Sequence, residues 1–254
     1  MSAVRRGLQR LLVASGAALA LTALATGARA QDDDEDPTNP SPARLKSGFE
    51  AMTRPVGMAE GNLSVLTLPG AEVCVQRNTG CKHGDVVFGL EGWEFYRWSS
   101  HWAFGAGVML GLLPTAYPRS PPESVPRDHT RSYFSFEGML RYYPYIGERF
   151  EAWFGPFGGL VVVSDRFTEI VSNDDRALLG SQGVTLRTEG GSIGLAGGLA
   201  RELGEHVSLL GSLRVSQWFL RFTPEKDPLG ATGSLTGSNT AIMLGVGIAY
   251  RASL

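Results

Sequence analysis

Histidine and serine are the residue types here that could most readily support catalysis, but their spacing indicates little chemistry. The four histidines are His83, His101, His129 and His206, and no two have the spacing of metal ligands. Ser99-Ser100-His101 is the one local cluster that could activate a nucleophile, although no clear acid partner lies beside it. Serine also favours turns for backbone reasons. We therefore favour a turn over a catalytic site at this position.

Export is indicated by the first thirty residues. Three arginines within residues 5–10 precede an apolar run over residues 11–25, and Ala28-Arg29-Ala30 has the A-x-A pattern of a cleavage site. These features predict a signal peptide over residues 1–30, cleaved after Ala30. An N-terminal membrane anchor is the alternative, but the apolar run is short for a spanning helix, which needs about 20 residues.

Cys74 and Cys81 are the only cysteines, and they lie in a stretch rich in glycine and proline. Because exported proteins meet an oxidising compartment, this pair predicts a local disulfide that closes one loop. His83 is close by, but two cysteines and one histidine fall short of a closed zinc site. The Asn-Asp-Asp run at residues 173–175 lacks the spacing of a calcium motif. The sequence thus predicts no cofactor and no metal site.

The charge of the exported chain argues against a nucleic-acid partner. Residues 1–30 carry four arginines and no acid, so 19 basic and 25 acidic residues remain, a net charge of −6. Nucleic-acid binding calls for a basic surface instead. Residues 31–57 begin with five consecutive acids from Asp32 to Asp36 and contain several prolines. We expect a flexible acidic segment there, a linker rather than a ligand-binding tail.

Eight segments of alternating apolar and small or polar residues follow from about residue 58. They cover residues 58–68, 85–96, 101–113, 131–144, 150–163, 187–201, 206–220 and 239–251. Membrane-spanning strands need about 9–11 residues, whereas strands of soluble proteins average about 5–6. The connections alternate between tight turns and long polar loops, a pattern typical of outer-membrane barrels. We predict an all-β fold over residues 58–254, an eight-stranded antiparallel up-and-down transmembrane β-barrel with both termini periplasmic.

The two faces of each predicted strand differ in polarity. Large apolar side chains share one face, which would contact lipid, and small or charged side chains share the other, which would fill the lumen. Glu91, Glu137, Arg141 and Arg214 can all point inward. Since buried charges must be paired, we favour a lumen plugged by ion pairs, as expected of a narrow eight-stranded barrel. A gated polar pore is the alternative.

Aromatic residues concentrate near the tight turns. They are Tyr96, Trp98, Trp102, Tyr142, Tyr143, Tyr145, Trp153 and, on the last strand, Tyr250. Such residues form belts at the lipid–water interface of membrane barrels. Aromatic packing beside turns is the alternative. We expect a belt at the periplasmic boundary of the membrane.

Two stretches resemble the small OmpA/OmpX-type outer-membrane barrel family. Residues 194–214 resemble its hairpins, in which a glycine-rich strand runs into a polar turn and an alternating strand. Residues 243–250 resemble its C-terminal assembly signal, although this chain continues through Arg251-Ala-Ser-Leu254 instead of ending on an aromatic residue. The resemblance implies a Gram-negative outer membrane, contact with outer-membrane lipid and lipopolysaccharide, and assembly by the barrel assembly machinery.

Three functions are compatible with such a barrel. A structural or surface-interaction role, through four long extracellular loops that contact an unknown surface partner, is the one we favour. A narrow pore for small solutes is the second. A lipid-modifying enzyme that uses a serine and a histidine at one rim is the third, and we expect the protein not to be an enzyme.

Overall fold

The computed structural model describes residues 55–73, 82–112, 115–120, 127–169, 183–226 and 235–253. These residues form nine strands. The strands are β1 (Val56–Val73), β2 (Lys82–Arg97), β3 (Trp102–Gly111), β4 (Thr115–Ser120), β5 (Arg127–Ile146), β6 (Phe150–Glu169), β7 (Gly183–Glu202), β8 (Val207–Leu220) and β9 (Ser238–Ser253). In these ranges no helix is long and apolar enough to cross a membrane.

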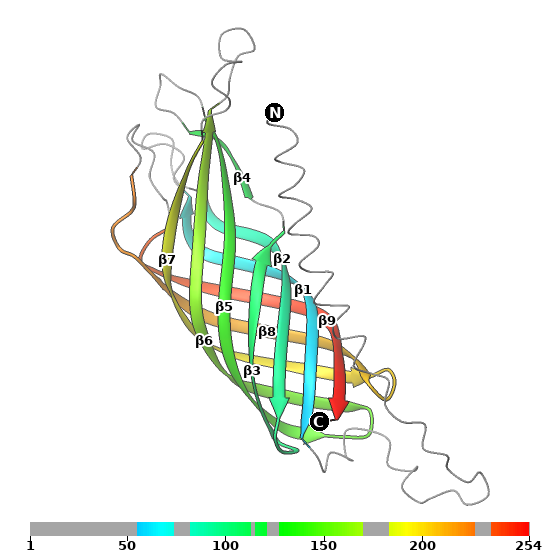
Figure 1. Ribbon diagram of the computed structural model, residues 1–254. Helices are drawn as coiled ribbons and strands as arrows, with labels where there is room; N and C mark the ends of the chain where they lie inside the picture. The colour runs from blue at the N-terminus through cyan, green and yellow to red at the C-terminus, as the bar shows by residue number, and fades with distance from the viewer. Residues whose placement is uncertain are drawn as a thin grey trace, which may run out of the picture. The chain divides into compact units, whose positions relative to one another are not determined.

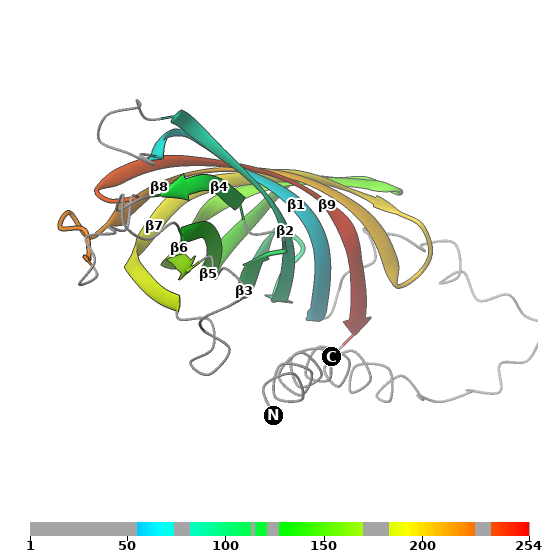
Figure 2. The same cartoon turned by 90° about the horizontal axis from the view of Figure 1, so that it is seen from above.

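The strands form one closed antiparallel barrel (Figure 1). Consecutive strands pair with each other except β3 and β4, which both pair with β5. β1 pairs with β9, and the pairing of β3 with β5 completes the ring (Figure 2). Eight strands go round the barrel because β3 and β4 follow each other along β5. The predicted eight-stranded up-and-down fold is therefore confirmed. We call the end with the tight connections the short-turn end and the opposite one the long-loop end.

The strands run further toward the long-loop end than the apolar alternation predicted. The strand expected over residues 150–163 extends to Glu169, and the one expected from 187 begins at Gly183. These extensions pair with each other, as Thr168 with Gly183 shows. Their outward residues are polar, so the apolar alternation ends although the hydrogen-bonded ladder continues.

Pro156 lies inside the strand predicted over residues 150–163, and because proline cannot donate to the ladder, the sequence predicts a local bulge there. The structure has no bulge at this position. The register between β6 and β7 runs through the pair Pro156 and Leu195 without a shift. The irregularity instead lies between Tyr142 and Tyr145 of β5, beside Pro144. Between the pairs that these two residues form, β5 has one residue more than β6. The bulge is therefore on the neighbouring strand, nearer the tight turn.

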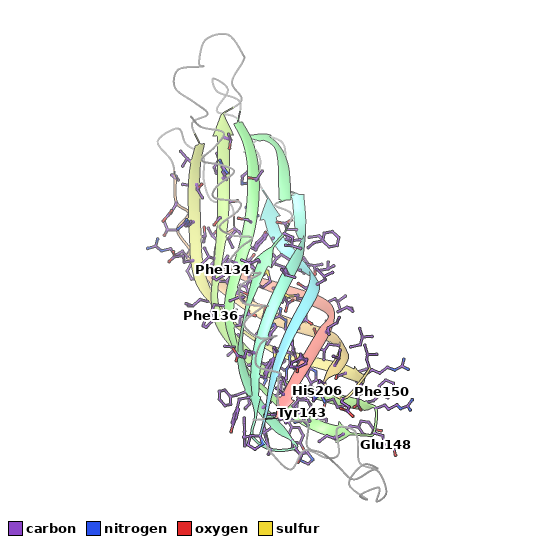
Figure 3. All side chains as sticks on the ribbon, turned by 45° about the vertical axis from the view of Figure 1, so that its right-hand side comes forward. Phe134, Phe136, Tyr143, Glu148, Phe150 and His206 are labelled. Atoms are coloured by element: carbon purple, nitrogen blue, oxygen red, sulfur yellow. The ribbon has the colours of Figure 1, made fainter. Side chains whose placement is uncertain are left out.

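The outside of the barrel is apolar. Leu63, Leu160 and Leu195 are about two-thirds exposed, and Phe134 and Phe136 project from the outer face of β5 (Figure 3). Glu94 also faces outward, four residues before the turn. This is the polarity of a barrel surrounded by lipid, since a soluble barrel would expose polar side chains.

The inside carries more large apolar side chains than the sequence predicted. A buried cluster that includes Leu66, Leu68, Trp218 and Leu235 occupies the inner face toward the long-loop end. Small and charged residues alone were expected there. A narrow barrel must fill its interior with side-chain volume, and large inward residues supply that volume where no charges are paired.

Candidate functional site

Arg214 of β8 lies at the centre of the ion pairs inside the barrel. Its Nη2 is 2.5 Å from Glu91 Oε2 on β2, and its Nη1 is 2.8 Å from Glu137 Oε2 on β5. Ser192 Oγ donates to Glu137 Oε1 at 3.0 Å, and Trp93 Nε1 donates to Glu91 Oε2 at 3.0 Å. The guanidinium on β8 therefore joins two buried carboxylates on β2 and β5, two strands that lie across the barrel from it with β3 between them.

Arg141 of β5 forms a second ion pair beside the first. Its two terminal nitrogens contact the two carboxylate oxygens of Glu60 on β1, at 2.5 and 2.8 Å. Its guanidinium lies between two rings, 3.6 Å from the centroid of Phe95 and 3.8 Å from that of Trp153. Bidentate pairing and stacking are geometries for which arginine is suited and lysine is not.

A third group lies closer to the short-turn end. Glu151 of β6 accepts from Arg97 at 2.8 Å and also pairs with Arg251 of β9. The Arg97 guanidinium lies over the Tyr143 ring at 3.8 Å and also donates to backbone carbonyls of the adjacent turn. This group links β9, the last strand of the barrel, to β2 and β6. Its two arginines neutralise Glu151, the last of the buried glutamates in the short-turn half.

A fourth group lies toward the long-loop end. Asp165 of β6 accepts from Arg131 Nε at 2.7 Å and contacts His129 Nε2 at 2.8 Å. Tyr133 donates to Asp85 of β2. These contacts tie β2, β5 and β6 together above the apolar cluster.

The structure places three of the four predicted lumen residues in one ion-paired group and the fourth, Arg141, in the adjacent group. Arg214 binds Glu91 and Glu137, as described, whereas the partner of Arg141 is Glu60. A cavity with room for about one water molecule lies between the two groups. Glu91 Oε1 and Trp153 Nε1 belong to residues that line it, and neither atom has a hydrogen-bond partner in the described part of the chain.

Several residues of this network were missed by the sequence analysis. They are Glu60, Arg97, Glu151 and Arg251, together with the group around Asp165. Inward parity would have found Glu60, which shares a face with Met58 and Asn62. Arg97 was assigned to a turn and Glu151 to a strand end, where parity says little until the pairing is known.

The aromatic residues divide between the two faces. Tyr96, Trp98, Trp102 and Tyr250 are 37–43% exposed on the outer face, and Tyr142 packs against Trp102 with centroids 4.9 Å apart. Trp153 and Tyr143, which were predicted to face lipid, are instead buried at 4% and 1% exposure. Their strand positions point inward, where both rings stack on arginines. The assignment of Trp153 to the belt was therefore wrong.

Ser99, Ser100 and His101 lie in the tight turn between β2 and β3. Ser100 Oγ is 2.8 Å from His101 Nδ1, and Ser99 Oγ accepts from the backbone N–H of Trp102 at 3.1 Å. Both contacts are at the exposed surface of the turn, and the Ser99 hydroxyl caps its backbone. No group of three or more His, Cys, Asp or Glu that could hold a metal occurs within the described residues.

Other predicted positions lie outside the described residues. They are the cleavage site at Ala30, the acidic segment up to residue 54, the cysteines Cys74 and Cys81, and the Asn-Asp-Asp run at 173–175. The expectations for them stay predictions.

An apolar exterior and an interior of paired charges define an eight-stranded β-barrel of the membrane-embedded class. The sequence matches no protein-family model and no curated protein. Among solved structures, the chain is similar to Ail, the attachment invasion locus protein of Yersinia pestis, crystallised with the heparin analogue sucrose octasulfate. The two are 12% identical, the match covers 79% of this chain and 100% of that one, and the TM-score is 0.44.

Two further structures show similar likeness. Neisserial surface protein A is 11% identical over 77% of this chain and 96% of its own, with a TM-score of 0.38. The outer membrane protein OprG of Pseudomonas aeruginosa is 16% identical over 82% and 98%, with a TM-score of 0.37. At these identities the likeness concerns the fold.

Proposed function

We propose that this protein is an integral outer-membrane barrel with a structural or surface-interaction role, exerted through its long loops. The observation that carries the proposal is the occupied lumen. Four glutamates and four arginines are paired inside the short-turn half, and an apolar cluster lies above them. These side chains support a plugged lumen, which would leave the loops as the surface available for a partner.

The placement in the outer membrane rests on independent features. The N-terminal pattern indicates export, and the apolar exterior requires lipid around the barrel. The aromatic belt of Tyr96, Trp98 and Trp102 lies at the short-turn end. Both termini of the barrel are at this same end, since Val56 pairs with Ser253. We assign this end to the periplasm and the long loops to the cell surface.

Membrane fractionation with a heat-modifiability gel tests the placement. We expect the protein in the outer-membrane fraction, with a folded band that shifts in mobility only after boiling. A soluble protein whose mobility does not change on heating would overturn the proposal.

Loop replacement tests the surface role. We expect replacement of the residues between Val73 and Lys82 by a short Gly-Ser turn to reduce adhesion of expressing cells to a surface coated with extracellular matrix. The matched control is the same replacement between Glu169 and Gly183. Both variants must retain the heat-modifiable band. If cells expressing the variants with each of the four loops replaced all adhered as strongly as cells expressing the wild type, the surface role would be contradicted.

A narrow pore is the second candidate, and the polar cavity beside Glu91 favours it. Planar-bilayer recording separates it from a plugged barrel. We expect no conductance steps from the wild type and steps from Arg214→Ala, because the substitution removes the side chain that joins the two sides of the lumen. Steps from the wild type of equal size would favour the pore.

A lipid-modifying enzyme at the rim is the third candidate, and the contact between Ser100 and His101 is its only support. Incubation with radiolabelled outer-membrane lipid tests it directly. We expect no product from the wild type. Product that is lost in Ser100→Ala would establish the enzyme and displace the surface role.

A further inference from the structure

Three arginines lie on neighbouring strands just beyond the apolar exterior, at the long-loop end. Arg166 is on β6, Arg187 is on β7, and Arg221 follows β8; all three are exposed. β6 and β7 lie side by side in the barrel wall (Figure 1). Ser164 pairs with Arg187, so Arg166 and Arg187 are diagonal neighbours, whose Cα atoms lie about 7–8 Å apart.

The third arginine is adjacent to the first two. The backbone N–H of Arg221 donates to the carbonyl of Glu189 on β7 at 3.4 Å, which places it beside the same stretch of strand. Toward the membrane, the exposed Glu189 comes next on the outward face of β7, and beyond it the outward side chains are apolar, with Leu160 64%, Ile193 62% and Phe219 53% exposed. The arginines therefore lie where the apolar surface ends. We call Arg166, Arg187 and Arg221 the arginine row.

The three arginines of the row outnumber the two carboxylates described beside them, which are Glu225 and Glu189, the latter on the same outward face of β7 as Arg187. Arg221 pairs with Glu225 at 3.3 Å. Within the described part of the chain, no carboxylate forms an ion pair with Arg166 or Arg187. Two adjacent cations on one sheet face repel each other unless an anion lies between them. By contrast, outward positions of comparable height on β1 and β9, such as Thr67 and Thr240, carry no charge.

An exposed aromatic ring completes the surface. Phe222 is 82% exposed, next to Arg221. Gly237, at a φ of 71°, packs beneath it, where a side chain would contact the ring at 3.6 Å. A ring held at the boundary of the apolar surface suits contact with both acyl chains and head groups.

We infer that the arginine row and Phe222 bind the phosphate groups of an outer-leaflet glycolipid, the lipid A portion of lipopolysaccharide, on one side of the barrel. Guanidinium groups match phosphate oxygens in bidentate geometry. The position at the edge of the apolar surface favours a lipid phosphate over a soluble polyanion, because the acyl chains of the same molecule can contact Leu160, Ile193 and Phe219. The inference rests on the proposed membrane placement.

The test is a titration of the purified full-length protein, in detergent, with lipid A carrying two phosphates and with the same lipid after complete dephosphorylation. One basic residue near an anionic lipid surface is worth about 1 kcal/mol, which is about fivefold in affinity. We expect Arg166→Gln with Arg187→Gln to weaken binding of the phosphorylated lipid by about 25-fold. The wild type should bind the dephosphorylated lipid as weakly as the double variant binds the phosphorylated lipid.

Arg201→Gln is the matched control, since Arg201 is an exposed arginine of the same strand, β7, at the opposite end. It should bind like the wild type, and Phe222→Ala should weaken both lipids equally. Each variant is first checked for the heat-modifiable band. Equal affinity of the double variant and the wild type for phosphorylated lipid A would overturn the inference. Heparin is titrated in parallel, and a double variant that loses heparin binding but keeps its affinity for lipid A would also overturn the inference, because that result would indicate a soluble polyanion. Failure of the adhesion experiment would leave this result unaffected.

Discussion

Arg214 and Arg141 show how single residues hold the lumen together. Each has its guanidinium almost fully buried, and each is bound to carboxylates from other strands. Burying such a pair brings little net stability, but removing one partner leaves an uncompensated charge, which costs about 3–5 kcal/mol. The contribution of these residues is therefore to specify which strands face one another across the barrel.

Arg141→Ala is expected to destabilise the barrel by about 3–5 kcal/mol, because Glu60 is left buried without its partner. Phe95 and Trp153 also lose the cation between them. The measurement is the melting temperature in detergent. As control, Arg141→Met combined with Glu60→Leu removes both charges and should recover most of the loss. An unchanged melting temperature for Arg141→Ala would contradict the role assigned to this ion pair.

The tryptophans provide a second prediction for single residues. In variants that retain one tryptophan each, brominated lipid should quench the fluorescence of Trp98 and Trp102, which face outward, but not of Trp153. Quenching requires contact between the indole ring and the brominated chain. Trp153 emission quenched as strongly as that of Trp102 would place its ring outside the lumen and contradict its contact with Arg141.

At the scale of single elements, β5 and β6 show how backbone packing limits the sequence. The sequence predicted both strands from their alternation, because a pleated strand with two environments must alternate. It could not predict that β6 approaches β5 too closely for a side chain at Gly155. A Cβ there would lie 1.7 Å from the carbonyl oxygen of Leu140. The glycines of the sequence look alike, and only the structure separates those that are required from those that are not.

Gly155→Ala is therefore expected to prevent assembly of a heat-modifiable barrel, or to lower its melting temperature strongly. Gly61→Ala is the matched control, because its Cβ would meet no atom within 4 Å. That variant should be neutral, or more stable by up to about 1 kcal/mol, since alanine loses less backbone entropy than glycine. Similar stabilities of the two variants would show that β5 and β6 are further apart than described.

At the scale of the whole molecule, closure of the sheet decides orientation. Because the number of strands is even, the first and last residues of the barrel both lie at the short-turn end. The exposed aromatic residues of the outer face lie at this end too. The arginine row lies at the opposite end. The two ends of the apolar surface thus carry different chemistry, as expected if they meet the two different leaflets of an outer membrane.

This asymmetry predicts which connections a protease can reach from outside the cell. A protease recognition site inserted between Glu169 and Gly183 should be cleaved on intact cells. The same site inserted in the turn between Glu202 and Val207 should be cleaved only after the outer membrane is permeabilised. Mass spectrometry of the purified chain should show an N-terminus at Gln31, as expected for cleavage after Ala30. Cleavage of both inserted sites on intact cells would reverse or abolish the proposed orientation.

The sequence by itself determined the strand number, the alternation of turns and loops, and which face of most strands is apolar. These properties depend on neighbouring residues, since alternation is local and loop composition is read along the chain. The inward position of Glu91, Glu137, Arg141 and Arg214 followed from the same parity.

Only the tertiary structure decided which charges meet. Glu60 and Arg141 are 81 positions apart, and Glu151 and Arg251 are 100 apart. Their contacts depend on the register of every strand between them and on closure of the ring. The same holds for Trp153, which lies beside other aromatic residues in the sequence but stacks on a buried arginine in the lumen. Pairing across a barrel is set by the geometry of the whole sheet, which no local pattern specifies.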